Sequence, residues 1–238
     1  MKNILALVFT FISSIGFSQE KVIFNDENVV LRDVQSYQSV VVSGPFKVYY
    51  STDPSTQVAV SAKDSDARDL IVTKVSGGKL YISLEGSGFR RWNINKEFKV
   101  YITAPKLSGL SLSGAVNFVV VDELSSTNLS LNLSGASNFS GKVECNEINA
   151  NLAGASDAKV SGLAQKITLV SSGASGFKGF DFKVNEADLD ATGASTIKIH
   201  VIESLKAKAS GASSIQYKGV PRLYNQSSIG ASSIRKID

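Results

Sequence analysis

Apolar and polar positions alternate with a period of two through much of this chain, on either side of a short phrase that keeps returning. The phrase is Gly-Ala-Ser or a close variant, and its glycines follow one another at steps of 21, 19, 19, 20, 18 and 19 residues. They are Gly114, Gly135, Gly154, Gly173, Gly193, Gly211 and Gly230. The positions two, four and six before each glycine are mostly Leu, Ile or Ala, whereas the odd positions are mostly Ser, Asn, Thr, Asp or Lys. Such alternation is typical of strands with one buried face.

Such a regular spacing between the repeated glycines predicts stacked coils. The fold class is therefore all-β, a parallel β-solenoid of roughly 19-residue coils, each made of two or three short strands, and the crossover rule favours a right-handed β-helix. Two alternatives stay open, a flexible Gly/Ser-rich linker and an antiparallel sandwich or barrel. The linker is disfavoured because Leu, Ile and Val recur at the same positions of the repeat over six steps, which a flexible linker does not require. The repeat region has no Asn-Gly or Asp-Gly hairpin turn, which disfavours the sandwich.

The apolar positions shift by one at the Gly-Ala pair, so the chain must bend there. Glycine accepts backbone angles that other residues resist. We interpret the invariant alanine as the inside of a tight corner, with Ala155 pointing inward and Ser156 outward. The same alignment places Asp188 and Asp190 beside Lys206 and Lys208 on adjacent coils, which predicts weak pairing across the strands.

Residues 1–18 have the features of a signal peptide: Lys2, an apolar stretch, and a small-x-small cleavage site at residues 16–18. We expect an exported protein that is periplasmic, associated with the cell surface or secreted, with no transmembrane segment after the signal is removed. A net charge of +4, spread along the chain, does not favour a nucleic acid partner. Cys145 is the only cysteine, so an internal disulfide is excluded and we expect this thiol to pack in the interior.

Residues 19–105 are β-rich but less regular, and we expect this N-terminal part to lead into the solenoid of residues 106–238 and to cap it. Residues 76–78 predict a hairpin turn. Residues 43–46 look like a degenerate copy of the repeated phrase.

The loop at residues 86–93 is the sharpest break in the pattern, and it contains the candidate ligand-binding residues Phe89, Arg90, Arg91 and Trp92. Tryptophan and arginine are enriched at binding hot spots. The alternative is that Phe89 and Trp92 close the end of the core. We predict no catalytic residue, metal site or cofactor, because His200 is the only histidine and has no partners for a catalytic triad or a metal near it in the sequence.

The sequence resembles the bacterial family called putative auto-transporter adhesin, head GIN domain. The resemblance rests on residues 42–48, on residues 79–82, on residues 100–105 with the following 110–115, and on the later Ser-Gly-Ala-Ser copies. The resemblance covers about residues 35 to 235. It implies a secreted or envelope β-solenoid, of a kind common in Bacteroidetes-type bacteria, with no established catalytic residue.

From the pattern and the resemblance together, we expect a non-enzymatic binding or structural module of the cell envelope. It would be adhesin-like and recognise an extended polymer or a protein surface. Its partner would be an envelope polysaccharide or another envelope protein. The alternatives are a glycan-cleaving solenoid enzyme and a self-associating scaffold that forms a homo-oligomer through the solenoid ends.

Overall fold

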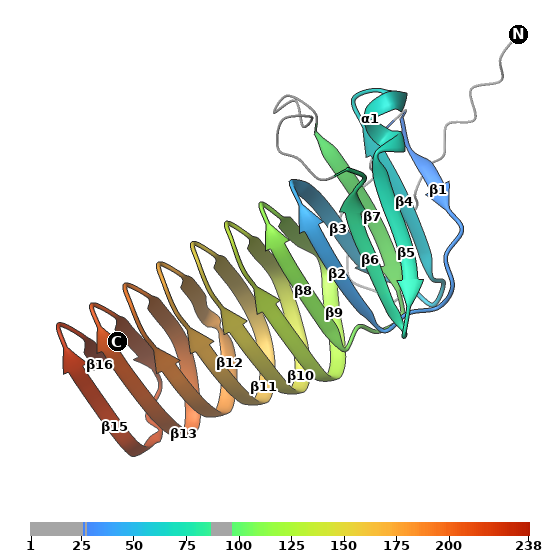
Figure 1. Ribbon diagram of the computed structural model, residues 1–238. Coiled ribbons are helices and arrows are strands. Elements are labelled where there is room, and N and C mark those ends of the chain that lie inside the picture. Colours follow the sequence, from blue (N-terminus) through green and yellow to red (C-terminus); the bar gives the residue numbers. More distant parts are fainter. Residues whose placement is uncertain (1–25, 27, 87–96) are drawn as a thin grey trace, which may run out of the picture.

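The structure is a computed structural model, and it describes residue 26, residues 28–86 and residues 97–238. Strands make up nearly all of its regular structure, and they stack into one long parallel solenoid (Figure 1). The predicted fold class is therefore confirmed. In the described part of the chain, no helix is long and apolar enough to cross a membrane.

The regular coils are built from strands that run almost without a break from one Gly-Ala turn to the next. They are β9 (Asn117–Leu133), β10 (Asn138–Leu152), β11 (Asp157–Ser171), β12 (Gly176–Ala191) and β13 (Thr196–Gly211). The last coil is divided into β14 (Ser214–Lys218) and β15 (Arg222–Gly230), and β16 (Ser233–Lys236) follows it. Neighbouring coils pair in parallel along most of their length. Each of the five coils β9 to β13 is thus one bent strand rather than two or three short ones.

The first coils do not follow one another in space as they do in the sequence. One coil consists of β2 (Ser39–Gly44) and β3 (Phe46–Thr52), and another contains β6 (Lys79–Leu84) and β7 (Phe98–Ala104). The β2–β3 coil lies between the β6–β7 coil and the coil formed by β8 (Gly109–Gly114) and β9. Gly44 pairs with Gly114, so the degenerate phrase at residues 43–46 does occupy a turn of the solenoid.

Antiparallel elements lie at this end of the solenoid (Figure 1). β4 (Gln57–Ala62) pairs with β7, β1 (Val30–Arg32) pairs with β4, and β5 (Ile71–Ser76) pairs with β6. The predicted hairpin turn joins β5 to β6, and both of its glycines have positive φ. The five-residue helix α1 (Ser65–Asp69) begins where the Asp64 carboxylate accepts a hydrogen bond from the Ala67 N–H.

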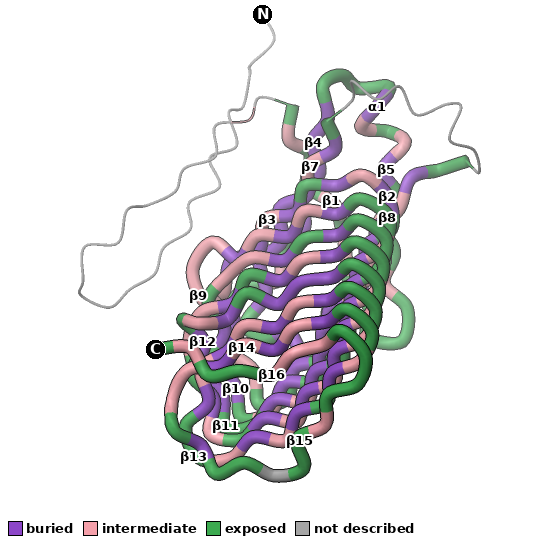
Figure 2. Tube along the Cα trace, turned by 90° about the vertical axis from the view of Figure 1, so that its left-hand side faces the viewer, coloured by how far each residue is buried: buried purple, intermediate pink, exposed green. Residues whose placement is uncertain are grey.

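The core is a single apolar column inside the coils, and buried and exposed positions alternate around it (Figure 2). The predicted inward positions are buried in the coil that ends at Gly135, where Leu129, Leu131 and Leu133 are almost fully covered. Side chains also stack along the axis, because the rings of Phe118 and Phe139 lie 5.9 Å apart and nearly parallel. Such stacking places each side chain on its counterpart in the next coil.

The turn differs from the prediction in one respect. In the complete coils the alanine of the phrase is exposed, whereas the serine after it is buried, as at Ala155 and Ser156. The inside and outside assignment at the corner was therefore wrong. The physical reason is that a buried serine hydroxyl can reach main-chain acceptors at the bend: Ser156 donates to the carbonyl of Ala153, and Ser213 donates to the carbonyl of Ala191 in the preceding coil. The buried Ser137 hydroxyl is the exception and has no hydrogen-bond partner among the described residues.

Glycine is required at the turn for two reasons. Gly154 has a φ of +75°, and a side chain there would come within 2.7 Å of the Gly135 carbonyl oxygen. That oxygen accepts a hydrogen bond from the Ala155 N–H at 2.8 Å. The turns are therefore joined to one another by the same main-chain bond from coil to coil.

The predicted charge register is confirmed. Asp188 is opposite Lys206, and Asp190 is opposite Lys208. The Lys206 ammonium lies 2.7 Å from the Asp188 carboxylate. Both side chains of this ion pair are well exposed, so it adds little to stability.

The burial at the corner predicts which of two neighbouring substitutions destabilises the fold. Ser156→Leu should lower the free energy of unfolding by about 1–3 kcal/mol, because it overpacks a buried site and removes a hydrogen bond. Ala155→Leu should change it by less than about 0.5 kcal/mol, because this side chain points into solvent. Thermal or denaturant unfolding of both variants measures the difference. A larger loss for Ala155→Leu would contradict the assignment.

Candidate functional site

The sequence-predicted binding residues Phe89, Arg90, Arg91 and Trp92 lie outside the described residues. The hypothesis that this loop binds a ligand remains a prediction. The described surface offers a different site, an open groove on the face of the solenoid that follows the Gly-Ala-Ser turns.

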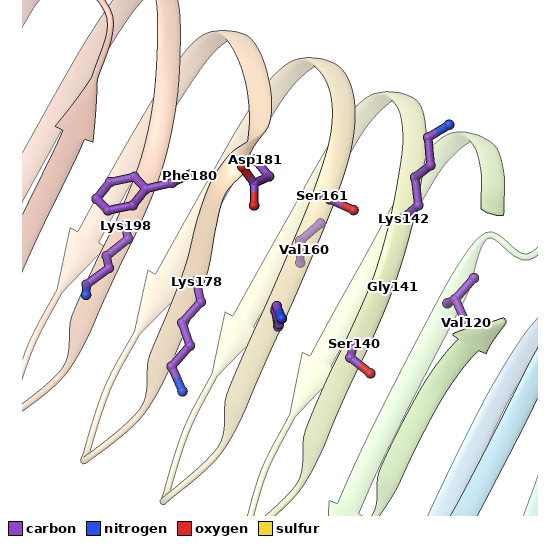
Figure 3. Close-up of a pocket in the computed structure, with 11 residues that line it drawn as sticks. Val120, Ser140, Gly141, Lys142, Val160, Ser161, Lys178, Phe180, Asp181 and Lys198 are labelled. Carbon is purple, nitrogen blue, oxygen red and sulfur yellow. The ribbon is translucent and has the colours of Figure 1, made fainter. Parts of the chain in front are cut away.

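This groove has a volume of about 580 Å³ and crosses five consecutive coils (Figure 3). Figure 3 shows Val120 on one side of it and Phe180 and Asp181 on the other, with Ser140, Gly141 and Ser161 between them. It is lined by Val120, Ser140, Gly141, Lys142, Lys159, Val160, Ser161, Lys178, Phe180, Asp181 and Lys198.

The groove exists because its coils differ in length. Three residues of β9, 120–122, lie where β10 has only Gly141, and three residues of β12, 179–181, lie where β11 has two. Extra residues in one strand leave the ladder and bulge outward. The two 19-residue coils of β10 and β11 therefore form a low floor between two longer coils. A side chain at Gly141 would overlap that of Val120, so glycine is needed where the bulge of β9 meets the floor.

Lysines form a column along this groove. Lys159, Lys178 and Lys198 are in register on β11, β12 and β13, each five residues after its turn glycine. On one side of the lysines the column passes through Ser140 of β10 to Val119 of β9, and on the other it continues through Gln216 to Arg235. Paired strands lie about 4.8 Å apart, and like charges directly opposite one another are destabilising.

Some charged columns on the opposite side of the coils are balanced. Glu147, Lys166 and Glu186 alternate in sign across three coils. Asp188 and Asp190 face lysines, as described above. The lysine column of the groove lacks this alternation of sign, and like charges on adjacent strands do not favour stability.

The lysines of the groove have different surroundings. Lys142 lies 2.6 Å from Glu123, and this hydrogen bond raises the pKa of the Lys142 ammonium. Lys178 lies 3.2 Å from Asp157, and more than half of its side chain remains exposed. Lys198 lies over the ring of Phe180, at 5.9 Å from its centre. Lys159 has no ion-pair partner among the described residues.

The chemistry of this site is that of an anion-binding surface. Four lysines line it against one carboxylate, that of Asp181. Exposed ion pairs such as Lys178 with Asp157 are weak, so a ligand can compete for the ammonium group. Within residues 26, 28–86 and 97–238, no group of three or more His, Cys, Asp or Glu side chains is placed to hold a metal ion. His200 is half-buried and is in register with Lys183 and Lys218 rather than with acidic partners.

Sequence reasoning missed this site although two signals for it were present. The lysines occupy one column once the coils are aligned on their glycines, and the steps of 21 and 20 residues flank the two steps of 19. The sequence was interpreted mainly from the positions before each glycine, because the apolar alternation is clearest there, and the lysines lie after the glycine.

A second hollow of about 310 Å³ lies near the bend at the far side of the coils, and Cys145 is among its lining residues. The predicted packing of this residue is confirmed, since Cys145 is buried and free. Burial, together with the charge of Glu144, raises the pKa of the thiol to about 11. The thiol is therefore protonated near neutral pH and is a poor nucleophile.

Comparisons with known proteins agree with this architecture. A family model described as putative auto-transporter adhesin, head GIN domain matches residues 36–221. A crystal structure of a putative adhesin from Bacteroides fragilis NCTC 9343 is similar, with a TM-score of 0.80 and 25% identity over 89% of this chain and 98% of that one. A comparison with curated proteins found no match.

Two structures from Parabacteroides distasonis ATCC 8503 share the fold at 19% identity. One is of a putative lipid binding protein, with a TM-score of 0.64 over 89% of this chain and 97% of that one. The other is of a putative adhesin, with a TM-score of 0.67 over 88% of this chain and 96% of that one.

The unbalanced column predicts opposite effects for one substitution made on two faces of a single coil. Lys159→Glu should raise the free energy of unfolding by about 0.2–1 kcal/mol, because it places a carboxylate opposite Lys178. Lys166→Glu should lower it by a similar amount, because it aligns three carboxylates with Glu147 and Glu186. Urea unfolding at low salt measures both shifts, and high salt should reduce them. Shifts of the same sign would show that the two faces are not electrostatically different.

Proposed function

The chain belongs to the putative auto-transporter adhesin, head GIN domain family, and from this premise we propose that it is an exported, non-enzymatic binding module of the cell envelope. Its ligand on this proposal is an extended polymer that lies in the groove over β10 and β11. The similar protein from Bacteroides fragilis, itself named a putative adhesin, supports a binding role.

The repetition of the groove is the observation that carries the proposal. Side chains in one column recur once per coil, so the surface presents the same group at a fixed interval along the solenoid axis. A polymer also presents the same group at a fixed interval, and it can make the same contact several times. Extended solenoid surfaces are suited to such ligands more than to a compact small molecule.

The residues of the groove favour binding over cleavage. Hydrolysis of a glycosidic bond generally uses two carboxyl groups, one as acid and one as base or nucleophile. Asp181 is the only carboxylate among the lining residues, and its side chain is exposed. A single solvated carboxylate does not supply both roles.

Obstruction of the groove tests the proposal. Ser161 lies on the floor and is partly exposed, so Ser161→Trp should fill the groove without entering the core. The parent protein should retain at least one polymer from a panel of envelope polysaccharides and release no shorter products. The variant should lose most of this retention, as measured by affinity electrophoresis or by pull-down with immobilised polymer.

Thr168→Trp is the matched control, because Thr168 is a partly exposed residue of the same strand outside the groove. It should bind as the parent does, and both variants should keep the parent's melting temperature within a few degrees. Equal binding by Ser161→Trp and the parent would place the site elsewhere. Shortened products would favour the glycan-cleaving enzyme, and retention of no polymer would favour the self-associating scaffold.

A further inference from the structure

Resting on the proposed function, we infer that the polymer is an acidic polysaccharide, which runs along the solenoid axis with its anionic groups on the lysine column. Lys159, Lys178 and Lys198 would each meet one anionic group. The proposal thus names both the chemical class of the ligand and its direction across the strands.

The spacing of the column gives the direction. Successive lysines belong to neighbouring strands, so their main chains lie about 4.8 Å apart along the axis. A chain lying parallel to a strand would meet one lysine of the column only. A chain lying along the axis meets all three, and it can reach Arg235 two coils farther on.

The electrostatics give the sign of the ligand. Three ammonium groups in consecutive coils repel one another, and Lys159 has no acidic partner in the described part of the chain. Lys218 adds a further positive charge beside the groove, where it lies 5.3 Å from the centre of the Phe180 ring. A polyanion would supply the missing counter-charges, and its hydrogen bonds to ammonium groups would be charge-assisted.

The floor favours a sugar chain over a single-stranded nucleic acid. Nucleic acid grooves of this type combine basic residues with aromatic rings on which bases stack. Phe180 is the only aromatic residue among those that line the groove, and the ammonium groups of Lys198 and Lys218 lie over its ring. The floor instead carries the hydroxyl groups of Ser140 and Ser161, which can donate to and accept from sugar hydroxyls.

The experiment compares acidic polymers with a neutral form of the same backbone. The probes are polygalacturonate, alginate and hyaluronate, fully methyl-esterified polygalacturonate, and single-stranded DNA. The parent should bind at least one acidic polysaccharide, at least tenfold more tightly than the esterified polymer or the DNA, and more weakly as salt increases. The triple variant K159Q/K178Q/K198Q should lose about tenfold or more in affinity and most of the salt dependence.

The control is the triple variant K166Q/K206Q/K208Q, which removes the same number of lysines from columns where they face acidic residues. It should bind as the parent does. Equal affinity for the acidic and esterified polymers, failure of every acidic probe, preference for DNA, or unchanged binding by K159Q/K178Q/K198Q would each overturn the inference. If Ser161→Trp abolishes binding of a neutral polymer while K159Q/K178Q/K198Q leaves it intact, the polymer-binding function stands and only the acidic class of the ligand is wrong.

Discussion

From Gly44 to Gly193, the carbonyl oxygen of each turn glycine accepts a hydrogen bond from the alanine N–H of the following coil, and this contact fixes how the coils stack. It requires a positive φ and leaves no room for a side chain, so the glycine column allows no substitute without strain. Because every coil starts from the same point, residues at the same distance after the glycine come into register. The Phe118 and Phe139 stack and the lysine column of the groove both follow from this alignment.

Coils of unequal length must place their extra residues somewhere other than the turn. They do so mainly on the outward face, where Val121 and Asp122 of β9 and Phe180 of β12 are partly exposed, whereas Val120 stays buried in the core. The core positions on either side of each bulge remain paired, so an inserted residue alters the surface and leaves the apolar column intact. A groove on this solenoid is thus a product of insertions in particular coils, and it needs no loop or additional domain.

The period-two alternation predicted the fold and the buried columns, because burial of one strand face is a local property of the sequence. The sequence analysis predicted Ala155 to be buried and Ser156 to be exposed, and the reverse is true. The alternation of apolar and polar residues does not decide which of two small residues at a bend is buried, because hydrogen bonding to the main chain decides it. The position of the β2–β3 coil between β6–β7 and β8–β9 could not be predicted, because it depends on pairing between distant residues such as Val42 and Leu112. Prediction of the groove requires the order of long and short coils along the solenoid. The spacing of the turn glycines does contain this order.

This displaced first coil bears on how the chain folds. From β10 onward each coil pairs with segments about one repeat away in the sequence, so its ordering closes only short loops. Val40 and Val42 instead must find partners in β6 and β8, about 40 and 70 residues later. Closing long loops costs more entropy and slows pairing. We expect the C-terminal coils to order first and the N-terminal end to close last, with the β2–β3 coil locked in place only when strands from both sides have formed.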